Sequence, residues 1–329
     1  MKIITLLCFL SIFIITGCNK NSGTSTITPV VPSQPDTLTT GWTRIVVDST
    51  DNFNDIYFSN SSIGFLTGRN GAYKSVNGGV SWTKIAYPQI HIVNLSVTPD
   101  GKLFGANFSD SIYRSTDAGF TFSNFRIPGG VQVSDVYFID NNNGFAALAS
   151  GLARTTDGGI TWSVVSTSGL GTTASNGYSS VFFINSTTGW VSRNFDIYKT
   201  NGNINNWVKS IIPGIVPNSN AIIFISAVSS SVVFAGYDNG TIYKSVDGGT
   251  TFSLISTLPS SSGLLDIHFL DVNNGYCGYG NRIYKSTDGG NSWQPVVSLG
   301  VGIIVEIHFV DINNGWGCTS SGSIVRFHQ

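Results

Sequence analysis

The chain has 329 residues, of which only 11% are charged, against about 25% in a typical soluble domain. It has a single glutamate, Glu306, but 38 glycines and 12% aromatic residues, so it lacks helix-surface residues and is rich in those of strands and turns. This composition excludes a helical or α/β enzyme, and a net charge of −1 without a dense basic run excludes nucleic acid as a partner.

The N-terminus has the pattern of an export signal. The apolar stretch from Ile3 to Ile15 has the length of a signal-peptide core and is too short to cross a bilayer as a helix. It ends in Ile15-Thr16-Gly17-Cys18, which resembles the bacterial lipobox, where cleavage leaves a lipidated cysteine at the new N-terminus. We expect residues 1–17 to be a lipoprotein signal peptide and Cys18 to carry the lipid. The alternative is an ordinary signal peptide with a chance cysteine.

Residues 18–41 are rich in Ser, Thr and Pro and have few large apolar side chains. Such a segment cannot bury enough surface to fold by itself, so it is expected to be a flexible tether. The mature protein would then be lipid-anchored in a bacterial cell envelope, at the outer membrane on its periplasmic or surface face. The lipid would be its only membrane contact.

The rest of the chain is repetitive. Five segments follow the pattern S/T-x-D-x-G-x-S/T-W/F, known as the Asp-box, with Asn77 in place of the acid in the first. They cover residues 75–82, 115–122, 155–162, 245–252 and 286–293. A degenerate copy at 200–207 has Gly202 in place of the acid. The closing aromatic residues fall at 82, 122, 162, 207, 252 and 293, which gives steps of 40, 40, 45, 45 and 41 residues. This period is typical of one four-stranded propeller blade.

The number of blades follows from the two ends of the repeat region. The last unit, residues 304–327, has only three strand patterns, whereas residues 42–47 resemble an outer strand with nothing before it. Trp42 also lies 40 residues before Trp82. We therefore predict an all-β fold over residues 42–329, a seven-bladed propeller of four-stranded antiparallel blades. The N-terminal strand 42–47 would complete the last blade and remove two exposed sheet edges.

The acids of the repeated turns are interpreted as structural. An aspartate after a strand can accept N–H bonds across its own turn, glycines allow positive φ, and the aromatic residue can pack between sheets. A catalytic or metal-binding role would not tolerate the asparagine that replaces the acid in the first copy. The turn residues are Asn77, Asp117, Asp157, Asp247 and Asp288.

The two rims of the propeller should differ. The repeated turns share one rim with short, similar connections, whereas the connections on the other rim vary in length and sequence, as binding loops usually do. Arginine and tyrosine are favoured at binding hot spots, and several occur at or near this variable rim. The candidate binding residues are Arg69, Arg193, Arg282, Tyr178, Tyr237, Asp238 and Tyr279. The alternative is that these are ordinary loop residues.

Other chemistry has little support in the sequence. Cys277 and Cys318 lie in second strands of adjacent blades and could form a disulfide in an oxidising compartment. His268 and His308 occupy one column of the repeat with aromatic residues, which favours packing over metal binding. No cofactor and no metal site are predicted.

The repeat resembles that of a known family. The run from Asp266 to Tyr276, followed by the run from Arg282 to Trp293, is similar to the repeat of photosystem II assembly and stability factor-like propellers, which carry Asp-box (BNR) repeats. The resemblance covers about residues 42–329. It implies noncatalytic binding of a protein or peptide during envelope assembly. A glycan is the other ligand that we consider for the variable rim.

The strongest enzyme alternative is a glycoside hydrolase of Asp-box type, either sialidase-like or xyloglucanase-like. Residues 125–128, Phe-Arg-Ile-Pro, match a sialidase motif whose arginine binds the substrate carboxylate. However, other outer strands also end in an apolar residue and proline, and Glu306 replaces aspartates of a repeat column. We therefore expect a protein that is not an enzyme.

Overall fold

The structure is a computed structural model, and it describes residues 35–85, 92–149, 151–165, 168–170, 180–193, 195–214, 223–259 and 264–329. The predicted signal peptide, Cys18, most of the tether and Tyr178 lie outside these residues. Within them, no helix is long and apolar enough to cross a membrane. The described residues from 35 onward belong to one compact unit.

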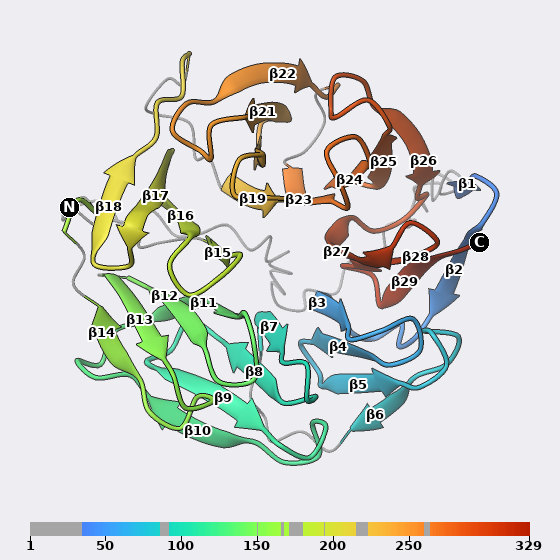
Figure 1. The fold of residues 1–329 in the computed structure, drawn as a ribbon. Helices are drawn as coiled ribbons and strands as arrows, with labels where there is room; N and C mark the ends of the chain where they lie inside the picture. The colour runs from blue at the N-terminus through green and yellow to red at the C-terminus, as the bar shows by residue number, and fades with distance from the viewer. Residues whose placement is uncertain are drawn as a thin grey trace, which may run out of the picture. The chain divides into compact units, whose positions relative to one another are not determined.

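Strands build this unit in seven antiparallel sheets around a central axis (Figure 1). Blade 1 contains β3 (Phe53–Phe58), β4 (Gly64–Gly68), β5 (Ala72–Ser75) and β6 (Thr83–Ile85). Blade 2 contains β7 (Asn94–Val97), β8 (Leu103–Ala106), β9 (Ser111–Ser115) and β10 (Ser123–Arg126). Blade 3 contains β11 (Val133–Phe138), β12 (Gly144–Leu148), β13 (Gly151–Thr155) and β14 (Ser163–Val165).

The next blades follow the same order from the axis outward. Blade 4 contains β15 (Ser180–Phe183), β16 (Gly189–Arg193), β17 (Asp196–Asn203) and β18 (Asn206–Lys209). Blade 5 contains β19 (Ile223–Ala227), β20 (Val233–Tyr237), β21 (Thr241–Ser245) and β22 (Ser253–Thr257). Blade 6 contains β23 (Leu264–Phe269), β24 (Gly275–Tyr279), β25 (Arg282–Ser286) and β26 (Gln294–Ser298). The predicted seven-bladed propeller is therefore confirmed, with blade 7 closing the ring.

Blade 7 is assembled from both ends of the folded chain. It consists of β27 (Ile304–Asp311), β28 (Asn314–Thr319) and β29 (Ser323–His328), with β2 (Trp42–Val46) as the outer strand. Strand β2 pairs with β29 from Trp42 opposite Phe327 to Val46 opposite Ser323. This is the closure that the spacing of Trp42 predicts.

The end of the predicted tether is also structured. Strand β1 (Thr37–Leu38) pairs with β26 and adds a fifth strand to blade 6. Just before it, the Asp36 carboxylate accepts a bond from the Gly300 N–H and lies 3.0 Å from the Arg44 guanidinium. These contacts hold residues 36–38 against the propeller, although their composition predicts an unfolded segment.

Aromatic stacks join neighbouring blades. The last aromatic ring of an inner strand lies flat on an aromatic ring from the second strand of the preceding blade. Ring centroids are 3.5 Å apart for Phe58 and Trp316, and 3.4 Å apart for Phe234 and Phe269. The inner-strand ring also covers a glycine of its own blade: a Cβ on Gly315 would lie 2.0 Å from the ring of Phe309. Glycine at this position therefore makes the stack possible.

The repeated turns fasten the third strand to the fourth. In blade 2, Asp117 accepts bonds from the Thr121 N–H and hydroxyl and from the Ser115 hydroxyl, while the Gly119 N–H donates to Ser115. The Thr121 hydroxyl contributes most to lowering the pKa of Asp117 to about 2. In blade 1, Asn77 accepts from the Ser81 N–H in the same way without a charge. This geometry agrees with the structural interpretation of these residues.

Candidate functional site

The structure separates the candidate arginines of the variable rim. Arg69 is exposed in the β4–β5 connection, and Arg282 is exposed at the start of β25. Arg193, at the end of β16, is only 5% exposed. They belong to blades 1, 6 and 4, and no two of these blades are neighbours in the ring. The structure therefore does not bring the three side chains into one cluster.

Two candidate tyrosines of this rim are buried between blades. The Tyr237 hydroxyl donates to the Phe195 carbonyl oxygen of blade 4, and Tyr279 lies against Gly240 of blade 5. Each tyrosine ends a second strand and packs on a connection of the preceding blade. Asp238 is half-buried beside Tyr237. Tyr178 lies outside the described residues, so the proposed rim site is reduced to Arg69, Arg282 and Asp238.

Arg126 lies far from the axis. It ends the outermost strand of blade 2, and its side chain is 74% exposed, with Nε 2.6 Å from a carboxylate oxygen of Asp110. A substrate-binding arginine of a sialidase would have to reach the central opening. This position supports a chance match of the Phe-Arg-Ile-Pro motif.

The two buried cysteines point away from each other. Both thiols are free, and they belong to different core clusters: Cys277 packs with Phe234 of blade 5, whereas Cys318 packs with Phe53 of blade 1. Register explains the difference, because Cys277 lies opposite Ile267 while Cys318 lies opposite Glu306, one position later in the repeat. A shift of one residue moves a strand side chain to the other face of its sheet. The disulfide that the sequence left possible is therefore not formed in this structure.

We expect neither cysteine to react in the folded protein. Both side chains are fully buried, and burial raises the pKa of each thiol well above its ordinary value. Iodoacetamide at pH 8 should label both residues in guanidinium chloride and neither in buffer, as measured by mass spectrometry of the digested protein. A Cys277–Cys318 linked peptide in a non-reducing digest would contradict this expectation.

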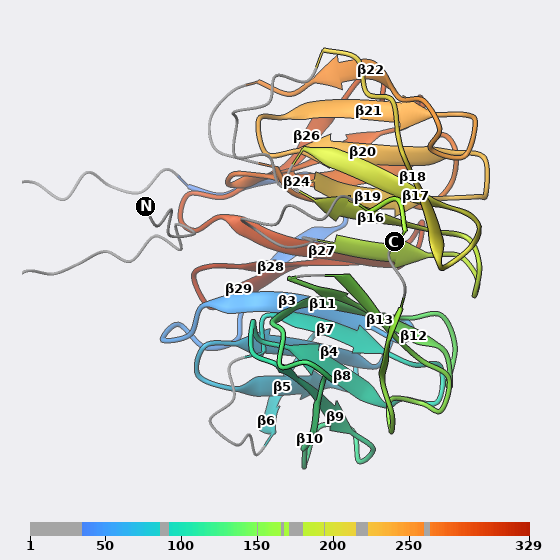
Figure 2. The same cartoon turned by 90° about the vertical axis from the view of Figure 1, so that its left-hand side faces the viewer.

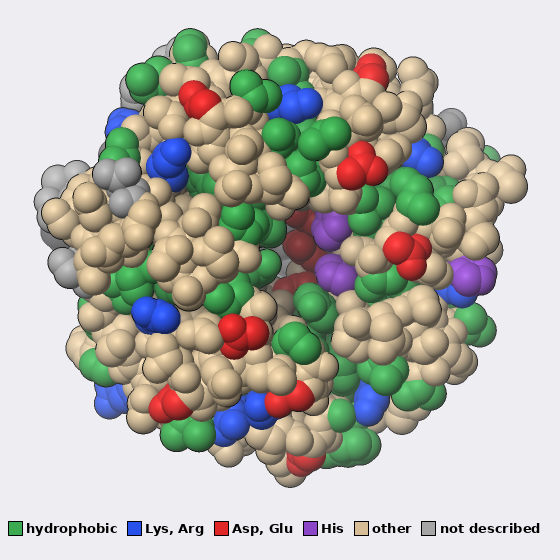
Figure 3. Space-filling view, viewed as in Figure 1, with side chains coloured by type: hydrophobic (Ala, Val, Ile, Leu, Met, Phe, Trp, Pro, Cys, Tyr) green, Lys and Arg blue, Asp and Glu red, His purple; other side chains and the backbone are tan. Residues whose placement is uncertain are grey.

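The axis of the propeller is a channel lined by two layers of inner-strand side chains. The layer nearer the repeated turns, which we call the collar, contains Tyr57, Ser96, Tyr137, Phe182, Ser226, His268 and His308. The layer two residues earlier on the same strands includes Asp55, Asp135, Asp266 and Glu306, which we call the carboxyl belt. Figure 3 looks into the central hollow from the side of the repeated turns, with histidine side chains at its edge and acidic side chains deeper inside.

Main-chain groups of neighbouring blades hold the belt carboxylates. The Leu95 N–H donates to Asp55 at 2.6 Å, the Val181 N–H donates to Asp135 at 2.8 Å, and the Ile307 N–H donates to Asp266 at 3.1 Å. Each bond joins one inner strand to that of the next blade. The carboxyl side chains thus help to set the angle between blades.

Burial opposes ionisation of the belt. It raises the pKa of Asp55 to about 8 and the pKa values of Asp135 and Asp266 to about 6. The pKa of Glu306 is also raised well above its ordinary value, mainly by burial and then by the charge of Asp266, with which it shares a hydrogen bond. The belt therefore holds closely spaced acids that do not all ionise at neutral pH.

The collar histidines are neutral. His308 accepts a bond from the Phe58 N–H through Nδ1, and burial lowers its pKa to about 3. Burial lowers the pKa of His268 to about 4. Among the described residues, no group of three His, Cys, Asp or Glu side chains could hold a metal ion. These histidines contribute ring packing and one hydrogen bond between blades 7 and 1.

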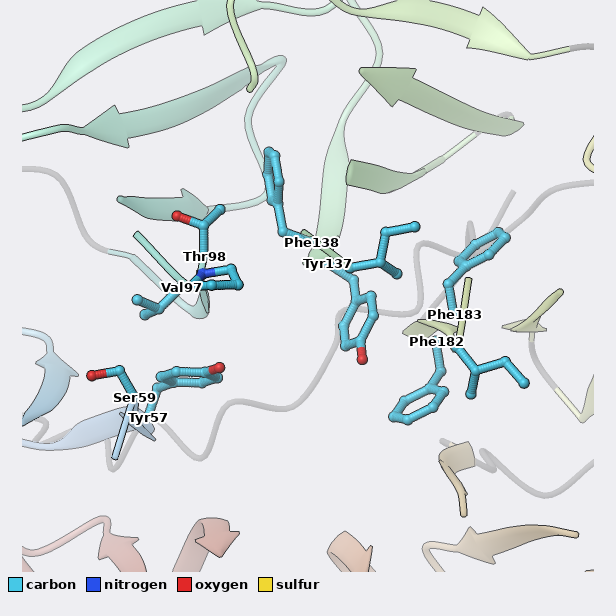
Figure 4. A pocket seen from close by; sticks show the side chains of 11 residues that line it. Tyr57, Ser59, Val97, Thr98, Tyr137, Phe138, Phe182 and Phe183 are labelled. Atoms are coloured by element: carbon cyan, nitrogen blue, oxygen red, sulfur yellow. The ribbon is translucent and has the colours of Figure 1, made fainter. Parts of the chain in front are cut away.

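A cavity of about 460 Å³ opens at the collar beside blades 1 to 4. Tyr57, Tyr137 and Phe182 extend into it from β3, β11 and β15, whereas Phe138 and Phe183 point away into the blade interfaces (Figure 4). Ser59, Pro99, Ile139 and Ile184 complete its rim. We call this space the mouth cavity. Its lining residues Ser59, Pro99 and Ile184 follow inner strands on the rim of the repeated turns, opposite the variable rim that the sequence favours. Figure 2 shows the blades from the side, with strand connections on both rims.

No family model and no curated protein sequence match the chain. Its structure is similar to YCF48 from Cyanidioschyzon merolae, with a TM-score of 0.68 and 20% identity over 88% of this chain and 98% of that one. It is similar to YCF48 bound to D1 peptide, with a TM-score of 0.69 and 17% identity over 92% and 99%. It is also similar to the GH74 xyloglucanase from Xanthomonas campestris, with a TM-score of 0.67 and 14% identity over 86% and 52%. At these identities the likeness is one of fold.

Proposed function

We propose that this chain is a noncatalytic binding protein whose propeller holds a segment of another protein at the mouth cavity. The observation that carries the proposal is the cavity itself, an open space of about 460 Å³ with three half-buried aromatic rings extending into it. Aromatic rings supply large contact areas with little loss of conformational entropy. The solved YCF48 structure with D1 peptide, which has the same fold, supports a peptide as the ligand.

The belt geometry favours binding over glycoside hydrolysis. Asp266 and Glu306 share a hydrogen bond. The two carboxyl groups of a glycosidase stand about 5 Å apart in retaining enzymes and about 6.5–9.5 Å apart in inverting ones. Two carboxyl groups that share a hydrogen bond are closer together than in either arrangement, so this pair does not match a glycosidase pair.

We also propose the cellular setting that the sequence predicts. The lipobox at Cys18 and the Ser/Thr/Pro-rich segment after it support a lipid-anchored protein of the bacterial envelope. The repeated turns support membership of the Asp-box propellers related to photosystem II assembly factors. In that setting the mouth cavity would bind an exposed segment of an envelope protein.

Blocking the cavity tests the proposal. Peptides would be selected from a displayed library of random 12-residue sequences on the folded protein, and their affinities measured by fluorescence anisotropy. Ser59 is exposed at the cavity rim, so S59W should fill the cavity without disturbing the core and weaken binding at least tenfold. S253W, on exposed outer strand β22, is the matched control and should bind normally. Selected peptides that bind S59W as well as wild type would contradict the proposal.

A further inference from the structure

We infer that the segment bound at the mouth cavity presents a lysine or arginine side chain, which passes between the collar rings and ends near the carboxyl belt. This inference rests on the proposed function and specifies its ligand. Three features carry it: the rings of the cavity, the acids behind them, and the charge of the groups around those acids.

The cavity rings are arranged to contact a cation. Tyr137 and Phe182 have centroids 5.1 Å apart and are inclined by 34°, and the ring of Tyr57 packs against His308 at 4.4 Å. All three cavity rings are half-buried, so part of each remains open to the cavity. A cation within about 6 Å of the centre of such a ring is attracted to its face, and the attraction grows as water is excluded. The aliphatic stem of lysine or arginine would pack on the same rings.

The carboxyl belt lies deeper in the channel than these rings. Asp55 and Asp135 precede Tyr57 and Tyr137 by two residues on the same strands, so each acid shares a face with its collar ring. Two residues of a strand span roughly 6.6 Å. This depth suits the flexible four-carbon stem of lysine or the longer arginine side chain.

The belt carboxyls have no cationic partner among the described residues. Their bonding groups there are main-chain N–H groups, the Asn94 and Ser180 side chains, and one another. The charges that act on Asp55 are those of Asp135 and Asp266, which oppose its ionisation. Because the collar histidines are neutral, they do not offset this repulsion. An entering ammonium or guanidinium group would relieve it.

A buried hydroxyl group beside the belt also supports a basic ligand. Thr67 lies directly opposite Asp55 in the β3–β4 pair, so both side chains lie on one face of the sheet. Thr67 is 2% exposed, and its hydroxyl has no hydrogen-bond partner among the described residues. Hydroxyl and carboxyl oxygens together can accept bonds from the several N–H groups of a lysine or arginine. The belt thus offers more acceptors than the described part of the protein uses.

The test combines one protein variant with one peptide change. D135N removes a belt charge but keeps an oxygen to accept the Val181 N–H, and Asn94 shows that an amide is accommodated in this column. D117N makes the same charge change in a repeated turn, on the rim of the mouth cavity and away from the channel. Asn77 occupies the equivalent position of the turn in blade 1. We expect the cavity-dependent peptides to contain lysine or arginine. Their affinity should fall about tenfold on D135N or on changing that residue to glutamine, and stay unchanged on D117N.

The outcomes separate this inference from the proposed function. Peptides that are blocked by S59W but need no basic residue, or that bind D135N as well as wild type, would overturn the inference and leave the proposed function standing. If no selected peptide is blocked by S59W, both are overturned. Thermal unfolding of each variant, measured in parallel, distinguishes lost binding from lost folding.

Discussion

Replacing Trp316 with alanine is expected to lower the free energy of unfolding by about 3–5 kcal/mol. Trp316 is fully buried between blades 7 and 1, and its ring stacks on Phe58 with centroids 3.5 Å apart. Its indole Nε1–H donates to the Gly78 carbonyl oxygen of blade 1 at 2.9 Å. Alanine would leave a cavity at the interface where the ring of blades closes. Urea-induced unfolding followed by circular dichroism measures the loss.

W316F is the matched control for this prediction. Phenylalanine retains the stack, and Phe145 and Phe234 already occupy the equivalent position in blades 3 and 5. The Gly78 carbonyl oxygen keeps a partner, because the Arg326 guanidinium also donates to it. W316F should therefore cost only about 1–2 kcal/mol, as expected for one lost hydrogen bond and a smaller ring. Equal losses for W316A and W316F would contradict the role of the stack.

Replacing Asp135 with asparagine is expected to stabilise the protein at high pH and not at low pH. Burial raises the pKa of Asp135 in the folded state to about 6, above its ordinary value of 3.8. Below that ordinary value the carboxyl is protonated in both the folded and the unfolded state, so its ionisation costs nothing. Above about pH 6 it is ionised in both states, and burial of the charge costs roughly 3 kcal/mol, since each pKa unit corresponds to about 1.4 kcal/mol.

The difference in unfolding free energy between D135N and wild type should therefore grow from pH 4 to pH 7 and then level off. Taking this difference cancels the titration of groups that Asp135 does not affect. Loss of the Asp135 charge also lowers the raised pKa values of Asp55 and Glu306, which adds to the stabilisation at high pH. The control is D117N, because Thr121 and Ser115 lower the pKa of Asp117 in the folded state. Its carboxylate stabilises the fold above pH 4, and that contribution is lost as the pH falls toward 2. A pH-independent effect of D135N would show that the buried carboxyl does not resist ionisation.

The periodic features of the fold were predictable from sequence. The spacing of the closing aromatic residues predicted the repeat of one blade, and the position of Trp42 predicted that the N-terminal strand completes the last blade. Placing both cysteines in second strands does not predict which way their side chains point. Alignment of the two strands residue by residue, from Gly275 and Gly315, puts Cys318 one position later than Cys277 and therefore on the other face of its sheet. Composition also failed for Thr37 and Leu38, because their pairing with β26 depends on a strand about 260 residues away.

The site was less predictable than the fold. Tyr237 and Tyr279 lie at strand ends, but sequence does not show that the preceding blade covers them. Asp55, Asp135 and Glu306 were recognisable as one column of the repeat. Successive side chains of an inner strand face one neighbouring blade and then the other, instead of alternating between core and solvent. The alternation therefore does not reveal which positions of the strand border the axis. Only the three-dimensional arrangement shows that the belt and collar columns face the axis.

The pairing of β2 with β29 also determines how this chain can associate with itself. Strand β2 is made before blades 1 to 6, whereas its partner β29 follows them, so blade 7 keeps an open edge until these two strands pair. An open edge pairs readily with any suitable strand. At high concentration, β2 of a second copy can pair with β29 in place of the chain's own β2. Blade 7 of the second copy then lacks its outer strand. Reciprocal exchange of β2 would yield a domain-swapped dimer in which every blade is complete.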